Sequence, residues 1–148
     1  MEITIYTDGA CTGNPGPGGW AAIILLKNEK KELYGGEKLT TNNRMELTAA
    51  IKAIEFCAQP EKKQPSLQLI KIFTDSVYVK DGITIWIDTW EKNNWKTADK
   101  KNVKNVDLWK KLKELTGANS IEWNWVKGHS ENPMNDLADK LAKKATPI

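Results

Sequence analysis

The chain has 148 residues, a length that favours a single domain, residues 1–148, whose core needs neither disulfides nor a structural metal. Hydrophobic residues make up 40% of the chain and charged residues 28%, which is typical of a globular protein, and no run of about 18 apolar residues could cross a membrane. The formal net charge of +3 is too small to indicate a nucleic-acid partner by itself.

The first 40 residues predict three strands with short connections. Residues 3–11 alternate in polarity and end at a Gly- and Pro-rich cluster, residues 13–19, which we expect to form a tight loop. Residues 20–27 form a nearly continuous apolar run, and a weaker strand over residues 32–39 is broken by Gly35 and Gly36. The three strands together predict an antiparallel meander.

The remaining chain alternates between helical and strand-like patterns. Apolar residues at helical spacing predict a helix over residues 43–58, and an apolar, β-rich run predicts a buried strand over 67–74. Further elements follow in order: short helices broken at Gly82 over 76–90, a helix over 106–115 closed by Gly117, a strand over 120–126 and a helix over 134–145. The order βββαβααβα predicts an α/β fold with a mixed five-stranded sheet flanked by helices.

Cellular location is indicated by what the sequence lacks. The two cysteines, Cys11 and Cys57, are too few for a disulfide framework or a zinc site. The N-terminus shows no basic region followed by an apolar one, so we expect no secretory signal. A reducing cytoplasm is therefore the expected location.

A short internal similarity links two of the predicted strands, because Ile5-Tyr6-Thr7-Asp8-Gly9 resembles Ile72-Phe73-Thr74-Asp75-Ser76. If these strands pair in parallel and in register, Asp8 and Asp75 project from the same face, on strands about 4.8 Å apart. Two carboxylates so close disfavour each other's ionisation, and a shared divalent cation such as Mg²⁺ removes that repulsion. Either residue alone is explained as well by a turn cap, but the matched pair favours a metal site.

Two further acids have competing explanations. Glu46 lies in the first turn of a predicted helix, three residues after Asn43, and this spacing favours a capping box. Asp139 lies off the leucine stripe of the last predicted helix, where a solvated helix face would explain it. Periodicity does not choose between Asp139 and the neighbouring Asp136.

The single histidine and several uncharged polar residues are also open to two explanations. His129 lies in a polar loop, where a surface position is the simple explanation, although its near-neutral pKa would suit proton transfer beside carboxylates. Turn and cap chemistry explains each of the polar residues taken singly: Asn14, Thr41, Asn42, Asn43 and Asn105.

A basic, tryptophan-rich segment covers residues 91–113. It contains eight lysines and three acids, a net charge of +5, which leaves −2 for the rest of the chain. Clustered lysines with nearby aromatic residues indicate a surface that contacts a phosphate backbone, and a solvated helix with core tryptophans is the alternative. We expect Trp109 to lie in the core and Trp90 and Trp95 to be accessible.

Several of these segments resemble motifs of one known family. The matching runs are Thr7-Asp8-Gly9 with Cys11, residues 13–20, Thr41-Asn42-Asn43-Arg44-Met45-Glu46-Leu47, Thr74-Asp75-Ser76, residues 95–101, Val126-Lys127-Gly128-His129 and residues 135–142. In order and spacing they resemble ribonuclease H of the bacterial type 1 class, ribonuclease HI, over essentially the whole chain. The resemblance implies the ribonuclease H-like fold, in agreement with the predicted element order.

The resemblance implies an endonuclease that hydrolyses the RNA strand of RNA/DNA hybrids, with little sequence specificity, and leaves 5′-phosphate and 3′-hydroxyl ends. Asp8, Glu46, Asp75 and Asp139 would bind two Mg²⁺ ions, with Mn²⁺ as a possible substitute. Asp8 would bridge the ions, Asp139 would help hold the ion that carries the attacking water, and Glu46 and Asp75 would hold the ion at the leaving oxygen. His129 would assist proton transfer or product release. This assignment replaces the cap explanation for Glu46 and selects Asp139 over Asp136.

The resemblance also implies the contacts with the hybrid. Residues along the minor groove would read the 2′-hydroxyls: Cys11, Asn14, Asn42 and Asn43, with Glu46 in reach of one hydroxyl. Thr41 and Asn105 would grip a phosphate of the DNA strand. The same strand would be followed by Trp86, Trp90, Lys96, Lys100 and Lys101.

The sequence departs from the family pattern at two positions. Some members have Gln after the Asp-Ser pair, where Val77 stands here, and some have Arg two residues before the pocket threonine, where Leu39 stands here. The departures would remove a hydrogen bond to RNA and weaken the grip on DNA. We expect no additional hybrid-binding module, hence modest processivity, and a monomer.

Overall fold

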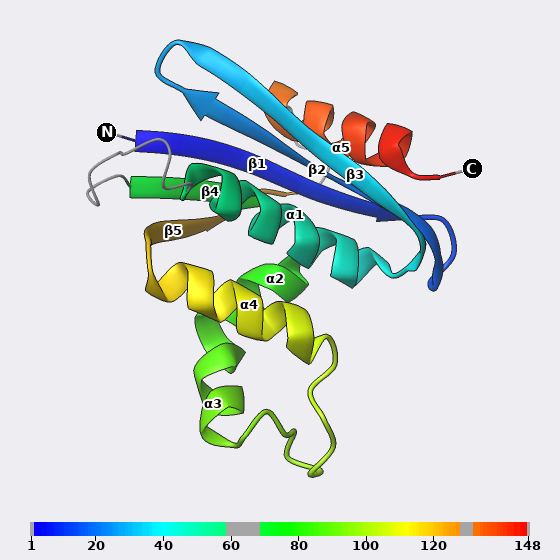
Figure 1. The fold of residues 1–148 in the computed structure, drawn as a ribbon, viewed down its shortest axis with the longest axis vertical. Helices are drawn as coiled ribbons and strands as arrows, with labels where there is room; N and C mark the ends of the chain where they lie inside the picture. Colours follow the sequence, from blue (N-terminus) through cyan, green and yellow to red (C-terminus); the bar gives the residue numbers. More distant parts are fainter. Residues whose placement is uncertain (1, 59–68, 128–131, 148) are drawn as a thin grey trace.

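The computed structural model describes residues 2–58, 69–127 and 132–147, and in this part of the chain five strands form one mixed sheet (Figure 1). The order across the sheet is β3-β2-β1-β4-β5. The β1–β2 and β2–β3 pairs are antiparallel, whereas β1–β4 and β4–β5 are parallel. The strands are β1 (Glu2–Cys11), β2 (Gly16–Leu26), β3 (Glu29–Thr40), β4 (Leu69–Thr74) and β5 (Ser120–Trp125). The predicted meander and mixed sheet are confirmed.

Helices cover both faces of this sheet. α1 packs on one face of β1 and β2, and α5 packs on the opposite face of the same strands (Figure 1). α4 lies against α1, while α3 and the loop that follows it project away from the sheet. The helices are α1 (Asn42–Cys57), α2 (Val77–Asp81), the π-helical segment η2 (Gly82–Trp86), α3 (Ile87–Lys92), α4 (Val106–Gly117) and α5 (Pro133–Ala145).

The core lies between the sheet and α1. Ile3 and Ile5 of β1, and Ile72 of β4, are buried together with Leu47 and Ile54 of α1. This follows from the two periods of the sequence, because alternate strand residues point to one face while helix residues three and four apart share one side. The sheet and α1 therefore hold each other in place around their apolar faces.

The glycines of β2 and β3 differ from their predicted roles. β2 begins at Gly16, so most of the predicted loop belongs to a strand, and β3 continues without a break through Gly35 and Gly36. A Cβ atom at Gly19 would lie 2.1 Å from the Ala142 carbonyl oxygen, and one at Gly36 would lie 2.2 Å from the Ala145 carbonyl oxygen. These glycines give α5 room to approach the sheet, so a break was the wrong interpretation.

The predicted boundary at Gly82 is present, because α2 ends at Asp81 and the π-helical segment η2 begins at Gly82. α2, η2 and α3 follow one another without interruption, and Gly82 is buried and has right-handed helical backbone angles. A Cβ atom there would lie 2.0 Å from the Cη2 atom of Trp109. The glycine therefore makes space for a tryptophan of α4.

Among residues 2–58, 69–127 and 132–147, no helix combines the length and the hydropathy needed to cross a bilayer.

Candidate functional site

The site begins where the pairing of β1 with β4 ends. Ile5 pairs with Ile72 and Thr7 with Thr74 in a parallel register, which confirms the pairing predicted from the internal similarity. Asp8 and Asp75 each follow the threonine of the last pair. The register therefore brings the two carboxylates to the same end of adjacent strands.

Glu46 of α1 completes a group of three acids. Asp8, Glu46 and Asp75 each offer a carboxylate oxygen, and these oxygens lie within 4.8 Å of one another. Asp8 and Glu46 are buried, and Asp75 is half-buried. The three residues line a cleft of about 580 Å³ that opens to the surface.

The local structure of α1 explains why Glu46 is not a capping residue. Thr41 is the N-cap, and its hydroxyl accepts a hydrogen bond of 3.2 Å from the backbone N–H of Arg44. Asn43 lies inside the helix, so the predicted capping box is wrong. Glu46 Oε1 instead accepts a hydrogen bond of 2.9 Å from the backbone N–H of Gly9, which joins α1 to β1 beside Asp8.

The carboxyl groups of Asp8 and Glu46 have raised pKa values. Burial, followed by the charge of Asp75, raises the pKa of Asp8 to about 8. Burial and then the charge of Asp8 raise the pKa of Glu46 well above its ordinary value. Both shifts arise because the charged form loses water and faces another carboxylate.

The donor set fits a divalent cation. Two buried oxygen atoms, Glu46 Oε2 and Asn135 Oδ1, have no hydrogen-bond partner among the described residues, and both residues line the cleft. Carboxylate and amide oxygens are the ligands that Mg²⁺ prefers. A cation held by the three acids would give Glu46 Oε2 a partner and remove the carboxylate repulsion that, after burial, raises the pKa values.

α5 brings both candidate acids of the last helix to the same cleft. Asp136 and Asp139 line it, but Asp139 lies outside the group of three, and its carboxylate forms an ion pair of 3.0 Å with Lys143, one helical turn along. Of the two, Asp139 is the one that helps raise the pKa of Asp8. The geometry therefore favours Asp139 as the fourth acid. His129 lies outside the described residues.

The predicted minor-groove residues gather at the rim of the cleft. Cys11, Asn42 and Asn43 line it, and the Asn42 backbone N–H donates a hydrogen bond of 3.1 Å to Asn14 Oδ1. The Cys11 thiol donates to the Thr40 carbonyl oxygen at 3.4 Å. These contacts tie the β1–β2 connection to the start of α1.

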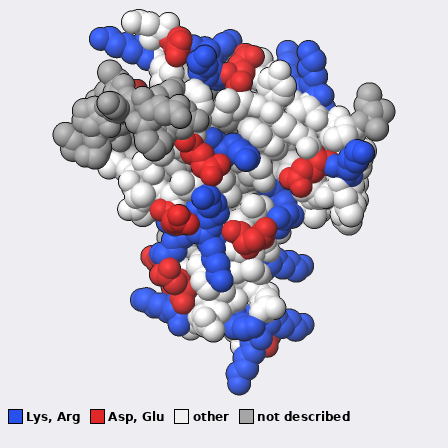
Figure 2. All heavy atoms as spheres, viewed as in Figure 1, with Lys and Arg blue, Asp and Glu red and all other residues white. Residues whose placement is uncertain are grey.

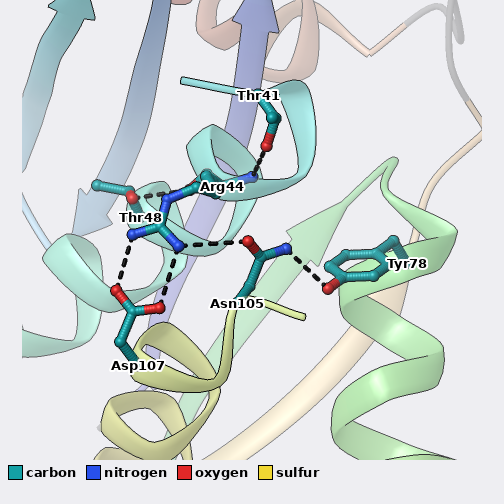
Figure 3. A network of polar contacts seen from close by, with 6 residues as sticks. All are labelled: Thr41, Arg44, Thr48, Tyr78, Asn105 and Asp107. Atoms are coloured by element: carbon teal, nitrogen blue, oxygen red, sulfur yellow. Dashed lines mark hydrogen bonds and ion pairs between the residues drawn. The ribbon is translucent and has the colours of Figure 1, made fainter. Parts of the chain in front are cut away.

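Thr41 and Asn105 belong to a separate polar network (Figure 3). Asn105 has left-handed backbone angles, with φ 60° and ψ 30°, and its side chain makes no cap hydrogen bond to α4. Its Oδ1 accepts from Arg44 Nη1 at 3.2 Å, and its Nδ2 donates to the Tyr78 hydroxyl at 3.0 Å. The Arg44 guanidinium also binds both carboxylate oxygens of Asp107, at 3.0 and 2.7 Å.

The loop between α3 and α4, which belongs to the basic segment, forms the end of the molecule farthest from the sheet (Figure 1). Lysine side chains gather at the lower tip of Figure 2, over this loop, where Lys96, Lys100 and Lys101 are exposed. Trp86 is 51% exposed.

The other tryptophans of the basic segment are less accessible. Trp109 is fully buried, as predicted. Trp90 and Trp95 are half-buried and pack against the core. Trp90 meets Trp109 edge-on, with ring centroids 5.3 Å apart, so only part of each predicted accessible face reaches solvent.

Sequence reasoning did not select Arg44, Tyr78, Asn135 or Lys143 as site residues. For Asn135 a signal was present. It shares the buried side of α5 with Ala138 and Ala142, three and seven residues later. A polar residue on an apolar stripe is the pattern that could have identified it.

Comparisons with known proteins agree with this geometry. The model of the family described as RNase H matches residues 1–146. Ribonuclease H of Maricaulis maris is 56% identical over 142 residues, which cover 96% of this chain and 91% of that protein. Ribonuclease H of Dechloromonas aromatica is also 56% identical over 142 residues, with the same two coverages of 96% and 91%.

Solved structures show the same fold. The crystal structure of LC9-RNase H1, a type 1 RNase H with the type 2 active-site motif, has a TM-score of 0.84 and 28% identity, and the match covers 98% of this chain and 72% of that one. The structure of LC11-RNase H1 in complex with an RNA/DNA hybrid has a TM-score of 0.74 and 22% identity, with coverages of 97% and 96%.

Proposed function

Because the chain belongs to the RNase H family, we propose that it is an endonuclease that hydrolyses the RNA strand of RNA/DNA hybrids. The observation that carries this proposal is the group of three acids that lie in β1, directly after β4 and near the start of α1. Their carboxylate oxygens lie within 4.8 Å of one another in an open cleft. The cleft offers metal ligands at its base and uncharged polar residues at its rim.

We propose that Asp8, Glu46, Asp75 and Asp139 hold two Mg²⁺ ions, with Mn²⁺ as a substitute. Asp8 would contribute to both ions, because Asp75, Glu46 and Asp139 all act on its carboxyl. When bound, the ions supply stabilisation of the attacking and leaving oxygens of phosphodiester hydrolysis. The chain's own residues supply the placement. The β1–β4 register fixes the two aspartates, and the Gly9 N–H fixes Glu46.

The rim of the cleft supports selection of the RNA strand. Cys11, Asn42 and Asn43 carry neutral groups that can donate or accept hydrogen bonds, which suits the 2′-hydroxyls that distinguish RNA from DNA. Contacts with sugars and phosphates carry no sequence information, so little sequence preference follows. The expected products carry 5′-phosphate and 3′-hydroxyl ends.

The remaining roles are proposed from the sequence. His129 assists proton transfer or product release, and His129→Ala slows the reaction without abolishing it. A single catalytic domain, a monomeric state and a cytoplasmic location complete the proposal. The location is supported by the low cysteine content, Cys11 and Cys57 alone.

The direct test compares end-labelled RNA in an RNA/DNA hybrid, as a single strand and in duplex RNA, each with and without Mg²⁺. We expect Mg²⁺-dependent cleavage of the hybrid alone. Absence of hybrid cleavage would overturn the proposal. Binding without turnover would indicate a hybrid-binding module, and cleavage of plain duplex DNA would indicate another nuclease or a strand-transferase.

A further inference from the structure

We propose that Arg44 is a positioning residue that makes the side chains of Thr41 and Asn105 face a DNA-strand phosphate as hydrogen-bond donors. The inference rests on the proposed function, in which these two residues contact the DNA strand of the hybrid. Arg44 reaches one of them with its backbone and the other with its side chain (Figure 3).

The first contact sets the polarity of Thr41. A hydroxyl group can donate one hydrogen bond and accept two. The Arg44 backbone N–H donates to Thr41 Oγ1 at 3.2 Å. Among the described residues, no acceptor takes the Thr41 hydroxyl proton in a hydrogen bond. The proton is thus available to a ligand.

The second contact sets the orientation of Asn105. A guanidinium group only donates hydrogen bonds, so the Asn105 atom that faces Arg44 Nη1 at 3.2 Å is the oxygen. The other end of the amide then faces Tyr78, whose hydroxyl oxygen accepts from Asn105 Nδ2 and from Trp109 Nε1, both at 3.0 Å. Turned over, the amide would set its NH2 group against the guanidinium, which has no acceptor, so the contact with Arg44 would be lost. One N–H of Nδ2 remains to donate to a ligand.

The Arg44 guanidinium is itself engaged elsewhere. Asp107 binds it through both carboxylate oxygens, and bidentate pairs of this kind fix the plane of the guanidinium group. The positive charge of Arg44 is therefore matched by Asp107, and the group acts as a scaffold instead of a phosphate ligand.

The orientation of Asn105 suits a phosphate. A phosphate oxygen accepts hydrogen bonds, so an asparagine presenting its oxygen would repel it. The position two residues before Thr41, where some family members have Arg, is Leu39, which is 73% exposed. Without a cation there, phosphate binding depends on neutral donors, and fixing their orientation in advance reduces the entropic cost of binding.

The test is a scan of hybrids in which one DNA-strand phosphate at a time is replaced by an uncharged methylphosphonate. Affinity is measured by fluorescence anisotropy with Ca²⁺ in place of Mg²⁺. For the wild-type protein we expect one position to lose roughly tenfold or more, because hydrogen bonds to charged groups are the strong ones. Arg44→Ala and Arg44→Lys, which keeps the charge but not the fork, both retain the backbone N–H at Thr41 and lose the side-chain fork at Asn105. In both variants we expect the affinity loss at that position to shrink by a measurable factor, while the other positions behave as in wild type. When the two Arg44 variants are assayed with Mg²⁺ and the unmodified hybrid, we expect their KM to be higher than that of the wild-type protein and their kcat to be the same.

Glu55→Ala is the matched control. Glu55 of α1 pairs with Lys111 of α4 at 3.7 Å, so Glu55→Ala breaks another contact between the same two helices. We expect this variant to lose affinity at the same phosphate position, and by the same factor, as the wild-type protein. The inference is overturned if no position is sensitive in the wild-type protein. A folded Arg44 variant that shows the full wild-type affinity loss at the sensitive position, or that loses affinity equally at all positions, also overturns it. If Arg44→Ala fails to fold, Arg44→Lys decides. Failure of the wild-type protein to bind or cleave the hybrid would instead overturn the proposed function.

Discussion

The buried carboxyl of Asp8 destabilises the fold when it is ionised without a cation beside it. Its pKa is about 8 in the folded protein, against an ordinary value of 3.8. Between these values the folded protein holds a proton that the unfolded chain has released. The stability that Asp8 contributes is therefore fully present below the unfolded-state pKa of 3.8 and is lost as the pH rises through the folded-state pKa of about 8. Glu46 acts in the same direction.

We predict that the melting temperature of the protein in EDTA falls as the pH rises from about 5 to about 8. Mg²⁺ should raise the melting temperature more at pH 8 than at pH 5, because the metal competes with protons for the same oxygens. Thermal unfolding followed by circular dichroism measures both effects. Asp8→Asn should flatten the pH dependence in EDTA, and a flat or rising curve for the wild-type protein would contradict the assignment.

The two acids of α5 offer a matched pair of variants. Asp139→Asn removes the residue that acts on Asp8, whereas Asp136→Asn removes a neighbour that only lines the cleft. We expect Asp139→Asn to lower kcat by more than the roughly 10–100-fold typical of residues that act behind metal ligands, and Asp136→Asn to change it little. The reverse ranking in a hybrid cleavage assay would assign the fourth acid to Asp136.

The acids also show what a local pattern can and cannot predict. The similarity between the two strand segments placed Asp8 and Asp75 together correctly, because both strands carry the same alternating apolar pattern, and that pattern sets the register. The spacing of Glu46 fitted a cap equally well. Only the approach of α1 to β1, where the Gly9 N–H binds Glu46, distinguishes the two roles, and that approach is set by packing between distant elements.

At the scale of elements, three glycines make space for atoms of other elements. Gly35 and Gly36 are strand breakers by propensity, yet both lie inside the continuous strand β3. Gly82 marks the predicted boundary between α2 and η2, but the helical backbone continues through it. The atoms that need the space belong to Trp20, α5 and Trp109. Since those partners come from other elements, no window of sequence around the glycine reveals them. The order and type of the elements, which depend on periodicity, were predicted correctly.

Gly82→Ala should destabilise the protein by about 1–3 kcal/mol or more, because the new methyl group overlaps a fully buried tryptophan. This cost exceeds the gain of roughly 1 kcal/mol that alanine brings to a helix.

Gly117→Ala is the control, since a Cβ atom there meets nothing within 4 Å. It should stabilise by about 0.4–1 kcal/mol. Urea unfolding of both variants measures whether the free energy of unfolding falls or rises. Equal changes in the two variants would refute the packing explanation.

At the scale of the whole molecule, the net charge of +3 separates into a segment of +5 and a remainder of −2. The lysines of its loop between α3 and α4 project at one end of the long axis (Figures 1 and 2), and the acids of the site line the cleft. Bound cations would cancel the repulsion between the cleft and a polyanionic substrate. Hybrid affinity should therefore be higher with Ca²⁺ than in EDTA, and equal affinities would count against this effect.

The salt dependence of hybrid binding should report the lysine contacts. Replacing Lys96, Lys100 and Lys101 with Ala should lower the slope of log affinity against log salt by roughly 2, because each lost phosphate contact removes about 0.7–0.9. Lys27, Lys30 and Lys31 lie near the β2–β3 connection at the opposite end of the long axis (Figure 1). The same triple change there should leave the slope unaltered. Equal slopes for the two triple variants would show that only total charge matters.

The buried acids are proposed to hold the ions that make this protein a nuclease, and Asp8 is central among them. The most direct measurement is single-turnover cleavage of a labelled hybrid by the wild-type protein and by Asp8→Asn, alongside the affinity of both for the same hybrid. We expect Asp8→Asn to lose cleavage while its affinity for the hybrid stays largely unchanged. Near-normal turnover by Asp8→Asn would contradict the metal role of the site.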